Sequence, residues 1–203
     1  MPILFLIRHG ETAYIGKRLQ GCKPGIHLIS RGEEQARQIA ESLKNHKFKA
    51  IYSSPLERAR ETAQPLASVL RMPVTSFDGI KEVDFGIWTG KSFRWLRAQP
   101  EWKKLYDDPK FQFPGGESLS KVRRRVVSSV KQIVNAHKKL EQIALFTHSD
   151  VVRFAVEFYL GMPPGGFHRL AVSTASLAIL RIVGDKITLL GFNLQLPYKI
   201  PDL

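Results

Sequence analysis

Two histidines and two arginines stand where a phosphate ester could be bound and attacked. Arg8 and His9 follow one apolar run, His148 follows another, and Arg58 lies in the first turn of an expected helix. Guanidinium groups, imidazole rings and a helix N-terminus together favour a dianion, most simply a phosphate. A neutral imidazole can attack phosphorus to form a phosphohistidine, while arginines neutralise the transition state. The set therefore predicts phosphoryl transfer through His9.

The leaving alkoxide of such a reaction needs a proton, and Glu82 is the best candidate donor. It lies in the hydrophobic stretch 80–86 just past a short expected strand. Partial burial beside a dianion would raise its pKa, so Glu82 could donate a proton and later act as the base for water. Asp84 is a nearby competitor for this role. Thr12 could contact the phosphate, or it could serve only to hold its own loop.

An α/β sheet would position these groups, because ligands bind at the carboxyl ends of its strands. Apolar runs at 3–7, 50–52, 74–77 and 143–147 predict strands, and helical spacing predicts helices after 30, from about 55 to 70, at 119–137 and at 151–160. The expected fold is α/β, with three layers and a mostly parallel central sheet covered by helices on both faces. A poorly periodic loop-and-helix region is inserted near 78–116.

Local signals predict where several elements begin. Ser30-Arg-Gly-Glu33 and Ser54-Pro-Leu-Glu57 read as capping boxes, the second with proline at the first helical position. Three strands are expected to close the chain, at about 170–175, 177–183 and 187–193, with Gly184-Asp185 as a turn between the last two.

Composition sets the class of protein. The 203 residues, 43% hydrophobic and 24% charged, fit one domain over 1–203. The net charge of +13 favours anionic partners such as phosphate esters, nucleic acid or an acidic membrane surface. Cys22 is the only cysteine, which excludes an internal disulfide and a cysteine-rich zinc site. Without a targeting signal or an apolar run long enough to span a membrane, a cytoplasmic protein is expected.

Several segments, in chain order, resemble one known family. They are Leu6-Ile-Arg-His-Gly-Glu-Thr12, Arg18-Leu-Gln-Gly21, Ser53-Ser-Pro-Leu-Glu-Arg-Ala-Arg-Glu-Thr-Ala63, Glu82-Val-Asp-Phe-Gly-Ile-Trp-Thr-Gly90, Gly115-Gly-Glu-Ser118 and Phe146-Thr-His-Ser-Asp-Val-Val-Arg153. The chain is similar over nearly its whole length to the histidine phosphatase superfamily, also called phosphoglycerate mutase-like.

The resemblance implies a role for each site residue and implies no metal or organic cofactor. His9 would be the phosphorylated nucleophile, Glu82 the acid and base, Arg8, Arg58 and His148 the phosphoryl-binding groups, and Gln20 and Gly21 contacts to substrate or phosphate. Three positions depart from the family pattern. Ile15 stands where many members have a phosphate-binding asparagine. Ser149-Asp150 replaces Gly-Gly or Gly-Asn, so Ser149 still offers its backbone N–H, while the Asp150 carboxylate would repel a dianion unless it is paired.

Three functions stay open, and the first is preferred. It is a metal-independent phosphomonoesterase that acts on a small phosphorylated substrate through phosphohistidine. The second is phosphoglycerate mutase-type transfer, which is disfavoured because the chain is short and Phe85 stands where mutases usually have tyrosine. The third is a basic binding protein with a vestigial pocket, although no nucleic-acid-binding motif supports it. Nothing in the sequence selects an oligomeric state.

The excess positive charge is concentrated in one segment. Residues 91–140 hold 13 Lys or Arg against four Asp or Glu, a net charge of +9. Part of this segment could frame the pocket and favour a substrate with a second anionic group. On this hypothesis, reversing the charge of Arg124 and Arg125 would weaken the binding of such a substrate.

Overall fold

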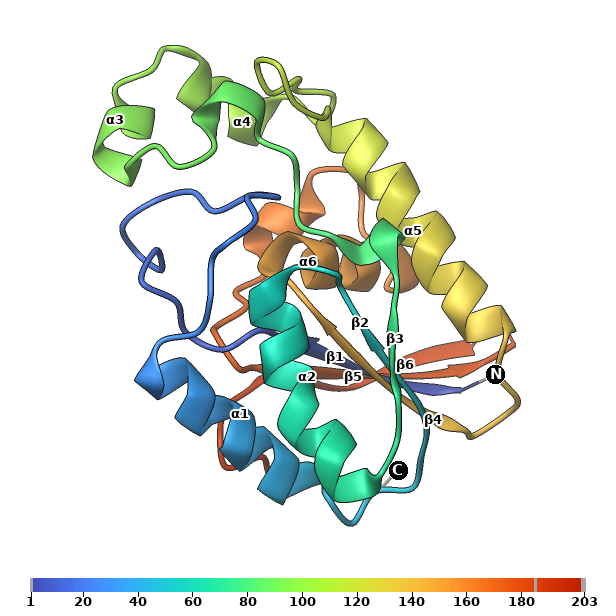
Figure 1. Ribbon diagram of the computed structural model, residues 1–203. Helices are drawn as coiled ribbons and strands as arrows, with labels where there is room; N and C mark the ends of the chain where they lie inside the picture. Colours follow the sequence, from blue (N-terminus) through green and yellow to red (C-terminus); the bar gives the residue numbers. More distant parts are fainter. Residues whose placement is uncertain (1, 185, 202–203) are drawn as a thin grey trace.

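The computed structural model describes residues 2–184 and 186–201, and its centre is a six-stranded sheet in the order β3-β2-β4-β1-β5-β6 (Figure 1). Strands β1, β2, β3 and β4 pair in parallel, whereas β5 pairs antiparallel with both β1 and β6. The mostly parallel sheet is therefore confirmed. The strands are β1 Ile3–Arg8, β2 Phe48–Ser53, β3 Val74–Ser76, β4 Gln142–Thr147, β5 Leu177–Val183 and β6 Lys186–Leu194.

Helices cover both faces of the sheet, because alternate residues of the buried strands face opposite sides. Leu4 and Leu6 of β1 pack in a cluster with α5 and α6, whereas Phe5 and Ile7 pack in a second cluster with α1 and α2. The molecule thus has three layers, with the sheet between two layers of helices and a hydrophobic core on each face of the sheet. The covering helices are α1 Ser30–Leu43, α2 Glu57–Leu70, α5 Leu119–Asn135 and α6 Ser149–Tyr159.

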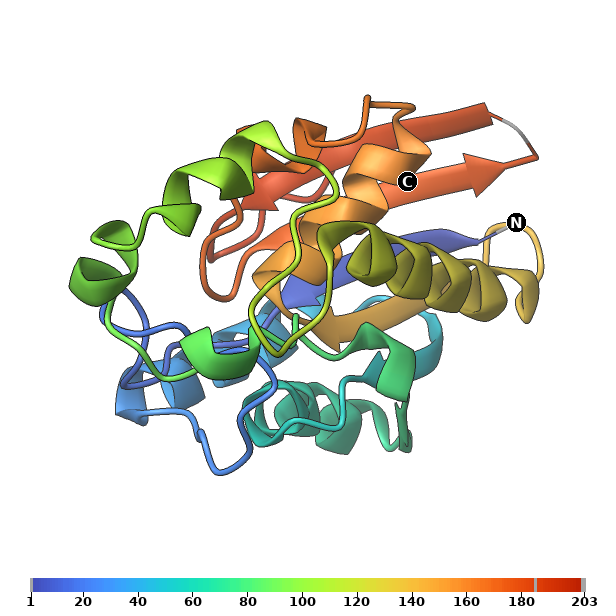
Figure 2. The same cartoon turned by 90° about the horizontal axis from the view of Figure 1, so that it is seen from above.

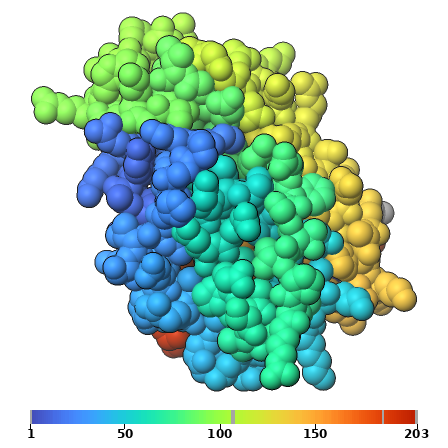
Figure 3. Space-filling view, in the orientation of Figure 1, coloured from blue at the N-terminus to red at the C-terminus, as the bar shows by residue number. Residues whose placement is uncertain are grey.

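The inserted region forms a cap beyond the carboxyl ends of β1 and β4 (Figure 2). It contains the 3-10 helices η1 Asp78–Ile80 and η2 Gly86–Trp88 and the short helices α3 Phe93–Arg97 and α4 Glu101–Asp107. The cap rests on the loop 10–29, where the Leu19 N–H donates to the Lys91 carbonyl at 3.0 Å and the Gly90 N–H donates to the Leu19 carbonyl at 2.7 Å. Figure 3 shows the cap directly above this loop. The expected insertion is confirmed.

Both predicted capping boxes are wrong. Helix α1 is preceded by Ile29 and helix α2 by Leu56, and neither residue supplies a side-chain cap. Ser30 already lies inside α1. Ser54 lies before α2, where its hydroxyl accepts the Leu56 N–H at 3.3 Å and contacts His148. Ser54, which the sequence pattern assigned to the start of a helix, thus contacts a histidine of the candidate site instead.

The strand expected at 170–175 is also wrong. This segment runs past the ends of β1 and β5, and its backbone groups bond to different elements instead of one neighbouring strand. The Val172 carbonyl accepts from Arg8, the Ser173 N–H donates to the Asn193 side chain, and the Ala175 N–H donates to the His9 carbonyl. Of the predicted turn at 184–185, Asp185 lies outside the described residues.

Among the helices of the described ranges, none is long and apolar enough to cross a membrane.

Candidate active site

The strand ends bring the predicted residues to one place. Arg8 ends β1 and is paired in register with Thr147 at the end of β4, so His9 and His148 leave adjacent strands side by side. Their ring centroids lie 5.2 Å apart. Arg58 enters from the first turn of α2 and Glu82 from the segment between η1 and η2. Together with His9 and Arg8, these two side chains line a pocket of about 100 Å³, which we call the reaction pocket.

His9 is held in the form that a nucleophile needs. Its ring is buried, and Nδ1 lies 2.7 Å from the Gly10 carbonyl. Because a carbonyl can only accept, Nδ1 carries the proton and Nε2 keeps its lone pair. Burial lowers the pKa of His9 well below its ordinary value, and the charges of Arg8 and Arg58 lower it further. The ring is therefore neutral near neutral pH.

His148 is oriented by Ser54. Its Nε2 lies 2.8 Å from the Ser54 hydroxyl oxygen, whereas its buried Nδ1 has no hydrogen-bond partner among the described residues. Burial, followed by the charge of Arg58, lowers the pKa of His148 well below its ordinary value, so this ring is also neutral. If the Ser54 hydroxyl donates to Nε2, Nδ1 carries a hydrogen that a phosphate oxygen can accept.

Arg8 and Arg58 bring into the site buried N–H groups that lack hydrogen-bond partners in the part of the chain that the structure describes. Arg58 is fully buried and donates from Nη2 to the Gly21 carbonyl at 2.7 Å, while Arg8 donates from Nη1 to the Val172 carbonyl at 2.6 Å. Within the described part of the chain, Nε and Nη1 of Arg58 and Nε of Arg8 are buried without partners. Unsatisfied buried charge is expensive, and burial lowers the pKa of both groups, yet arginine stays protonated. A bound dianion would satisfy these donors.

Glu82 has the properties of a proton donor. Its carboxyl is buried, and burial together with the charge of Asp150 raises its pKa to about 7, although Arg58 opposes the shift. Oε1 accepts the Val83 N–H at 3.1 Å, and the Ser149 hydroxyl lies 3.4 Å from Oε2. The competitor Asp84 is exposed, and its carboxylate accepts the Gly86 N–H. Of these two competitors, Glu82 and not Asp84 thus lines the reaction pocket.

Most of the remaining predicted residues line the reaction pocket, whereas Thr12 holds its own loop. Gln20, Gly21 and Ser149 line the reaction pocket, and Gly21 also holds Arg58 through its carbonyl. Thr12 is buried, and its hydroxyl donates to the Gln20 side chain at 3.1 Å, which fits the loop-holding alternative. Ile15 also lines the pocket and brings no donor from its side chain.

Asp150 is paired, as its position beside a dianion requires. Nη1 of Arg153 donates to its carboxylate at 3.0 Å. The two residues lie one turn apart on α6, so the helix itself sets this contact. The pairing reduces the repulsion that an acidic residue here would exert on phosphate.

One supporting contact was missed by sequence reasoning. Arg125 of α5 donates to both oxygens of Glu117, at 2.9 and 2.7 Å, and also to the backbone carbonyls of Gly79, Lys81 and Glu82. It therefore holds the segment that carries Glu82. Three consecutive arginines on a helix carry no signal that singles out this one.

The structure gives the charge-reversal hypothesis for Arg124 and Arg125 no support. Arg124 is exposed on α5, Arg125 is engaged by Glu117 and the carbonyls, and neither lines the reaction pocket or the cavity beside it. From the basic segment, Arg97 of α3 is the arginine that lines this second cavity.

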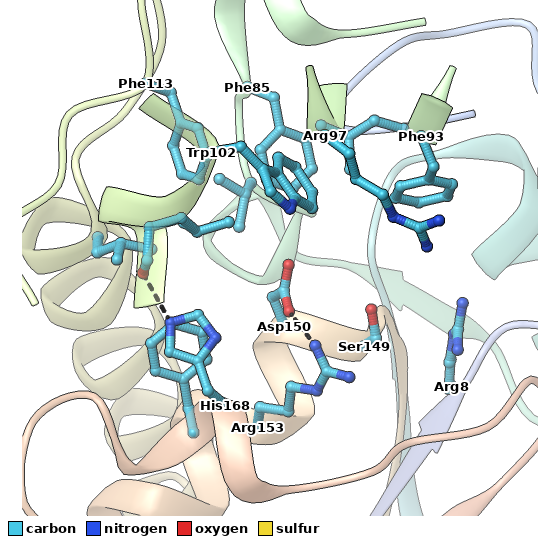
Figure 4. Close-up of a pocket in the computed structure, with 15 residues that line it drawn as sticks. Arg8, Phe85, Phe93, Arg97, Trp102, Phe113, Ser149, Asp150, Arg153 and His168 are labelled. Atoms are coloured by element: carbon cyan, nitrogen blue, oxygen red, sulfur yellow. Dashed lines mark hydrogen bonds and ion pairs between the residues drawn. The ribbon is translucent and has the colours of Figure 1, made fainter. Parts of the chain in front are cut away.

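That second cavity, which we call the outer chamber, has a volume of about 430 Å³ and adjoins the reaction pocket (Figure 4). The two spaces share Arg8, Phe85, Phe93, Ser149 and Asp150 among their lining residues. A phosphate bound at His9 would therefore have its ester group directed toward the outer chamber.

A mostly parallel α/β sheet with two adjacent histidines and two arginines at its strand ends defines a phosphoryl-transfer site. Comparison with known proteins gives the family: a sequence profile of the histidine phosphatase superfamily (branch 1) matches residues 4–195. The chain belongs to this superfamily, as its motifs predicted.

Named relatives include phosphatases and a mutase-like protein. Phosphoserine phosphatase 1 of Hydrogenobacter thermophilus is 29% identical over 199 residues, which cover 96% of this chain and 93% of that protein. A probable phosphoglycerate mutase of Proteus mirabilis is 28% identical and covers 86% of this chain and 82% of its own length. The solved structure of a phosphoserine phosphatase of Entamoeba histolytica superposes with a TM-score of 0.85 at 29% identity, covering 95% of this chain and 97% of that one.

These relatives support phosphate-ester hydrolysis, and the mutase alternative is less favoured. The chain is a phosphoric monoester hydrolase of the histidine phosphatase superfamily, which confirms the predicted class of enzyme.

Proposed function

We propose that the chain hydrolyses phosphate monoesters of small molecules, with His9 as nucleophile and Glu82 as acid and base. Arg8, Arg58 and His148 bind the transferred phosphoryl group. The observation that carries this proposal is a group of buried nitrogens around His9 without hydrogen-bond partners among the described residues, namely Nε of Arg8, Nε and Nη1 of Arg58 and Nδ1 of His148. Buried polar groups are normally satisfied, so these open nitrogens support the binding of an anion beside His9.

In the first step Nε2 of His9 attacks phosphorus. The N–P bond forms as the bond from phosphorus to the ester oxygen breaks, and Glu82 gives its proton to the departing oxygen. A pKa near 7 keeps a useful fraction of Glu82 protonated at neutral pH. The guanidinium groups of Arg8 and Arg58 stabilise the charge on the phosphoryl oxygens.

In the second step water attacks the phosphohistidine. Glu82, now a carboxylate, takes a proton from the water while the new P–O bond forms and the N–P bond breaks. Phosphate leaves, His9 returns to its neutral form, and Glu82 is again protonated. One carboxyl thus serves both half-reactions, as an intermediate pKa allows.

The named relatives suggest the kind of substrate to test first. Two of them carry phosphoserine in their names, and a third is described as a phosphoglycerate mutase. A small molecule that carries one phosphate ester fits the reaction pocket of about 100 Å³ better than a nucleic acid backbone does. The high net charge is then a general attraction for anions and not a nucleic-acid site.

The proposal is tested with an aryl phosphate in the presence of a metal chelator. We expect phosphate release by the unaltered protein and none by His9→Ala. The control variant is His27→Ala, because this exposed histidine binds Glu61 outside the reaction pocket. Undiminished release by His9→Ala would overturn the mechanism. Phosphoglycerate interconversion faster than hydrolysis would favour the mutase alternative instead.

A further inference from the structure

The outer chamber is much larger than the reaction pocket, and its lining combines aromatic and aliphatic side chains with charged ones. Its volume is about 430 Å³, against about 100 Å³ for the pocket around His9. Cavities of a few hundred Å³ commonly hold ligands of drug-like size. An alcohol as small as serine or glycerate would leave most of the chamber filled by water.

Aromatic rings form one wall of the chamber. Figure 4 shows Phe85, Phe93, Trp102 and Phe113 along this wall, opposite a wall that carries His168 together with Asp150 and Arg153. Phe93 and Trp102 are half-buried, so parts of their rings stay open to the chamber. Their centroids lie 6.5 Å apart at an interplanar angle of 72°. Such rings offer faces and edges to a flat or apolar group.

Buried rings behind both walls hold them in place. Trp102 packs against the buried Trp88, with centroids 5.8 Å apart, and His168 packs against the buried Phe167 at 3.8 Å. Phe167 in turn stacks on Phe154 at 4.3 Å. A chamber whose walls are already ordered loses little entropy when a ligand enters, which favours apolar binding there.

Three arginines and one carboxylate line the chamber, so its lining carries a net positive charge. Arg8 belongs to the proposed phosphate site, and Arg153 donates to the Asp150 carboxylate and, from Nε, to the Leu170 carbonyl. The guanidinium of Arg97 points into the space from the cap and is exposed (Figure 4). Because water screens this exposed charge, Arg97 is a weaker basis for selectivity than the aromatic wall.

We propose that the substrate is the phosphate monoester of an alcohol that carries an aromatic ring, and that this ring lies in the outer chamber against Trp102 and Phe93. The proposal rests on the proposed function, because the phosphate must lie at His9 for its ester group to reach the chamber. A ring bound there adds affinity to every state of the reaction and therefore raises kcat/KM mainly through KM.

The test compares phenethyl phosphate with ethyl phosphate. Their alcohols have similar acidity, so a difference in kcat/KM reports binding of the ring and not an easier departure of the alkoxide. For the unaltered protein we expect kcat/KM to be roughly tenfold or more higher for phenethyl phosphate, as for a base stacked on an aromatic side chain. Equal values, or a higher kcat/KM for phosphoserine than for phenethyl phosphate, would overturn the proposal.

Two variants locate the effect. Trp102→Leu should reduce the preference for phenethyl phosphate several-fold and Phe93→Leu should do the same, since leucine keeps the cap packed without a ring. The control is Trp95→Leu, because Trp95 lies on the same cap, 38% exposed and outside the chamber, where it contacts Lys91. A preference lost equally in all three variants would contradict the assignment to Trp102 and Phe93.

Binding separates this proposal from the proposed function. Calorimetry with the His9→Ala protein should show phenethyl phosphate binding roughly tenfold more tightly than ethyl phosphate. If turnover is absent in the unaltered protein but this affinity ratio holds, the hydrolytic function fails while the ring site stands. If turnover is present and the affinities are equal, the ring site fails alone.

Discussion

Replacing Glu82 by glutamine should change how the stability of the protein depends on pH. The carboxyl is buried, and burial together with Asp150 raises its pKa from an ordinary value of 4.5 to about 7. Between these values the folded protein binds a proton that the unfolded chain releases, so stability falls as pH rises through this range. At about 1.4 kcal/mol for each tenfold change in acidity, the loss is about 3 kcal/mol.

Glutamine resembles the protonated carboxyl in shape and cannot ionise. We therefore expect Glu82→Gln and the unaltered protein to have similar free energies of unfolding near pH 4 and to diverge above it, with the variant about 3 kcal/mol more stable at about pH 8. Urea unfolding at several pH values measures this difference, and the same denaturant slope in both proteins is required for the comparison.

The same variant should lose activity, because glutamine cannot supply a proton to the leaving group. For an alkyl ester we expect kcat to fall by roughly 10² to 10⁴, with a smaller fall for an aryl ester whose leaving group needs no proton. In the unaltered protein kcat/KM for the alkyl ester should decline above about pH 7, where Glu82 ionises. A difference in unfolding free energy that does not change with pH would contradict a raised pKa of Glu82 in the folded protein.

Three further substitutions test other parts of the site. Arg58→Lys keeps the charge but loses the planar set of donors that holds the Gly21 carbonyl, so kcat/KM should fall by roughly 10² or more; retention of activity would contradict a direct phosphate contact. Ser54→Ala removes the partner of His148 Nε2, and we expect roughly tenfold lower kcat/KM together with a changed tautomer in nitrogen NMR; an unchanged tautomer would show that Ser54 does not set it. Arg125→Gln leaves Glu117 unpaired and should lower the free energy of unfolding by about 2 kcal/mol or more, whereas the exposed control Arg124→Gln should stay within about 0.5 kcal/mol; equal effects in urea unfolding would contradict the role of Arg125.

The strands and helices with a clear hydrophobic pattern were predictable from the sequence. The run at 3–7 is buried on both faces of β1, and both core clusters use its alternate residues, so its strand was evident from hydrophobicity alone. The polar residues just after such runs, Arg8, His9 and His148, could then be placed together from the geometry of parallel sheets. Arg58 and Glu82 followed because each comes shortly after a strand.

The predictions that were wrong concern residues whose partners lie far away in the sequence. Ser54 fits a capping pattern, but its hydroxyl is engaged by His148, which lies 94 residues away. The segment 170–175 has strand-like composition, yet its backbone groups satisfy Arg8, His9 and Asn193 instead of a neighbouring strand. Local propensity carries no information about such partners.

The outer chamber was only partly foreseeable. The tryptophans and phenylalanines of the cap lie close together in the sequence. That Trp102 and His168 line the same cavity arises from the packing of the cap against the segment after α6, where His168 contacts the Leu105 carbonyl. Arg97 could not be separated from the other basic residues of 91–140, because only the position of α3 makes it face the chamber.

We infer that the phosphoryl group passes through His9. Rapid mixing with a phosphate ester, quenching with base and intact-mass analysis test this step directly, since phosphohistidine survives base and is lost in acid. We expect a transient mass gain of one phosphoryl group that maps to the peptide containing His9 and is absent in His9→Ala. Turnover with no such intermediate, or with the phosphoryl group on another residue, would contradict it.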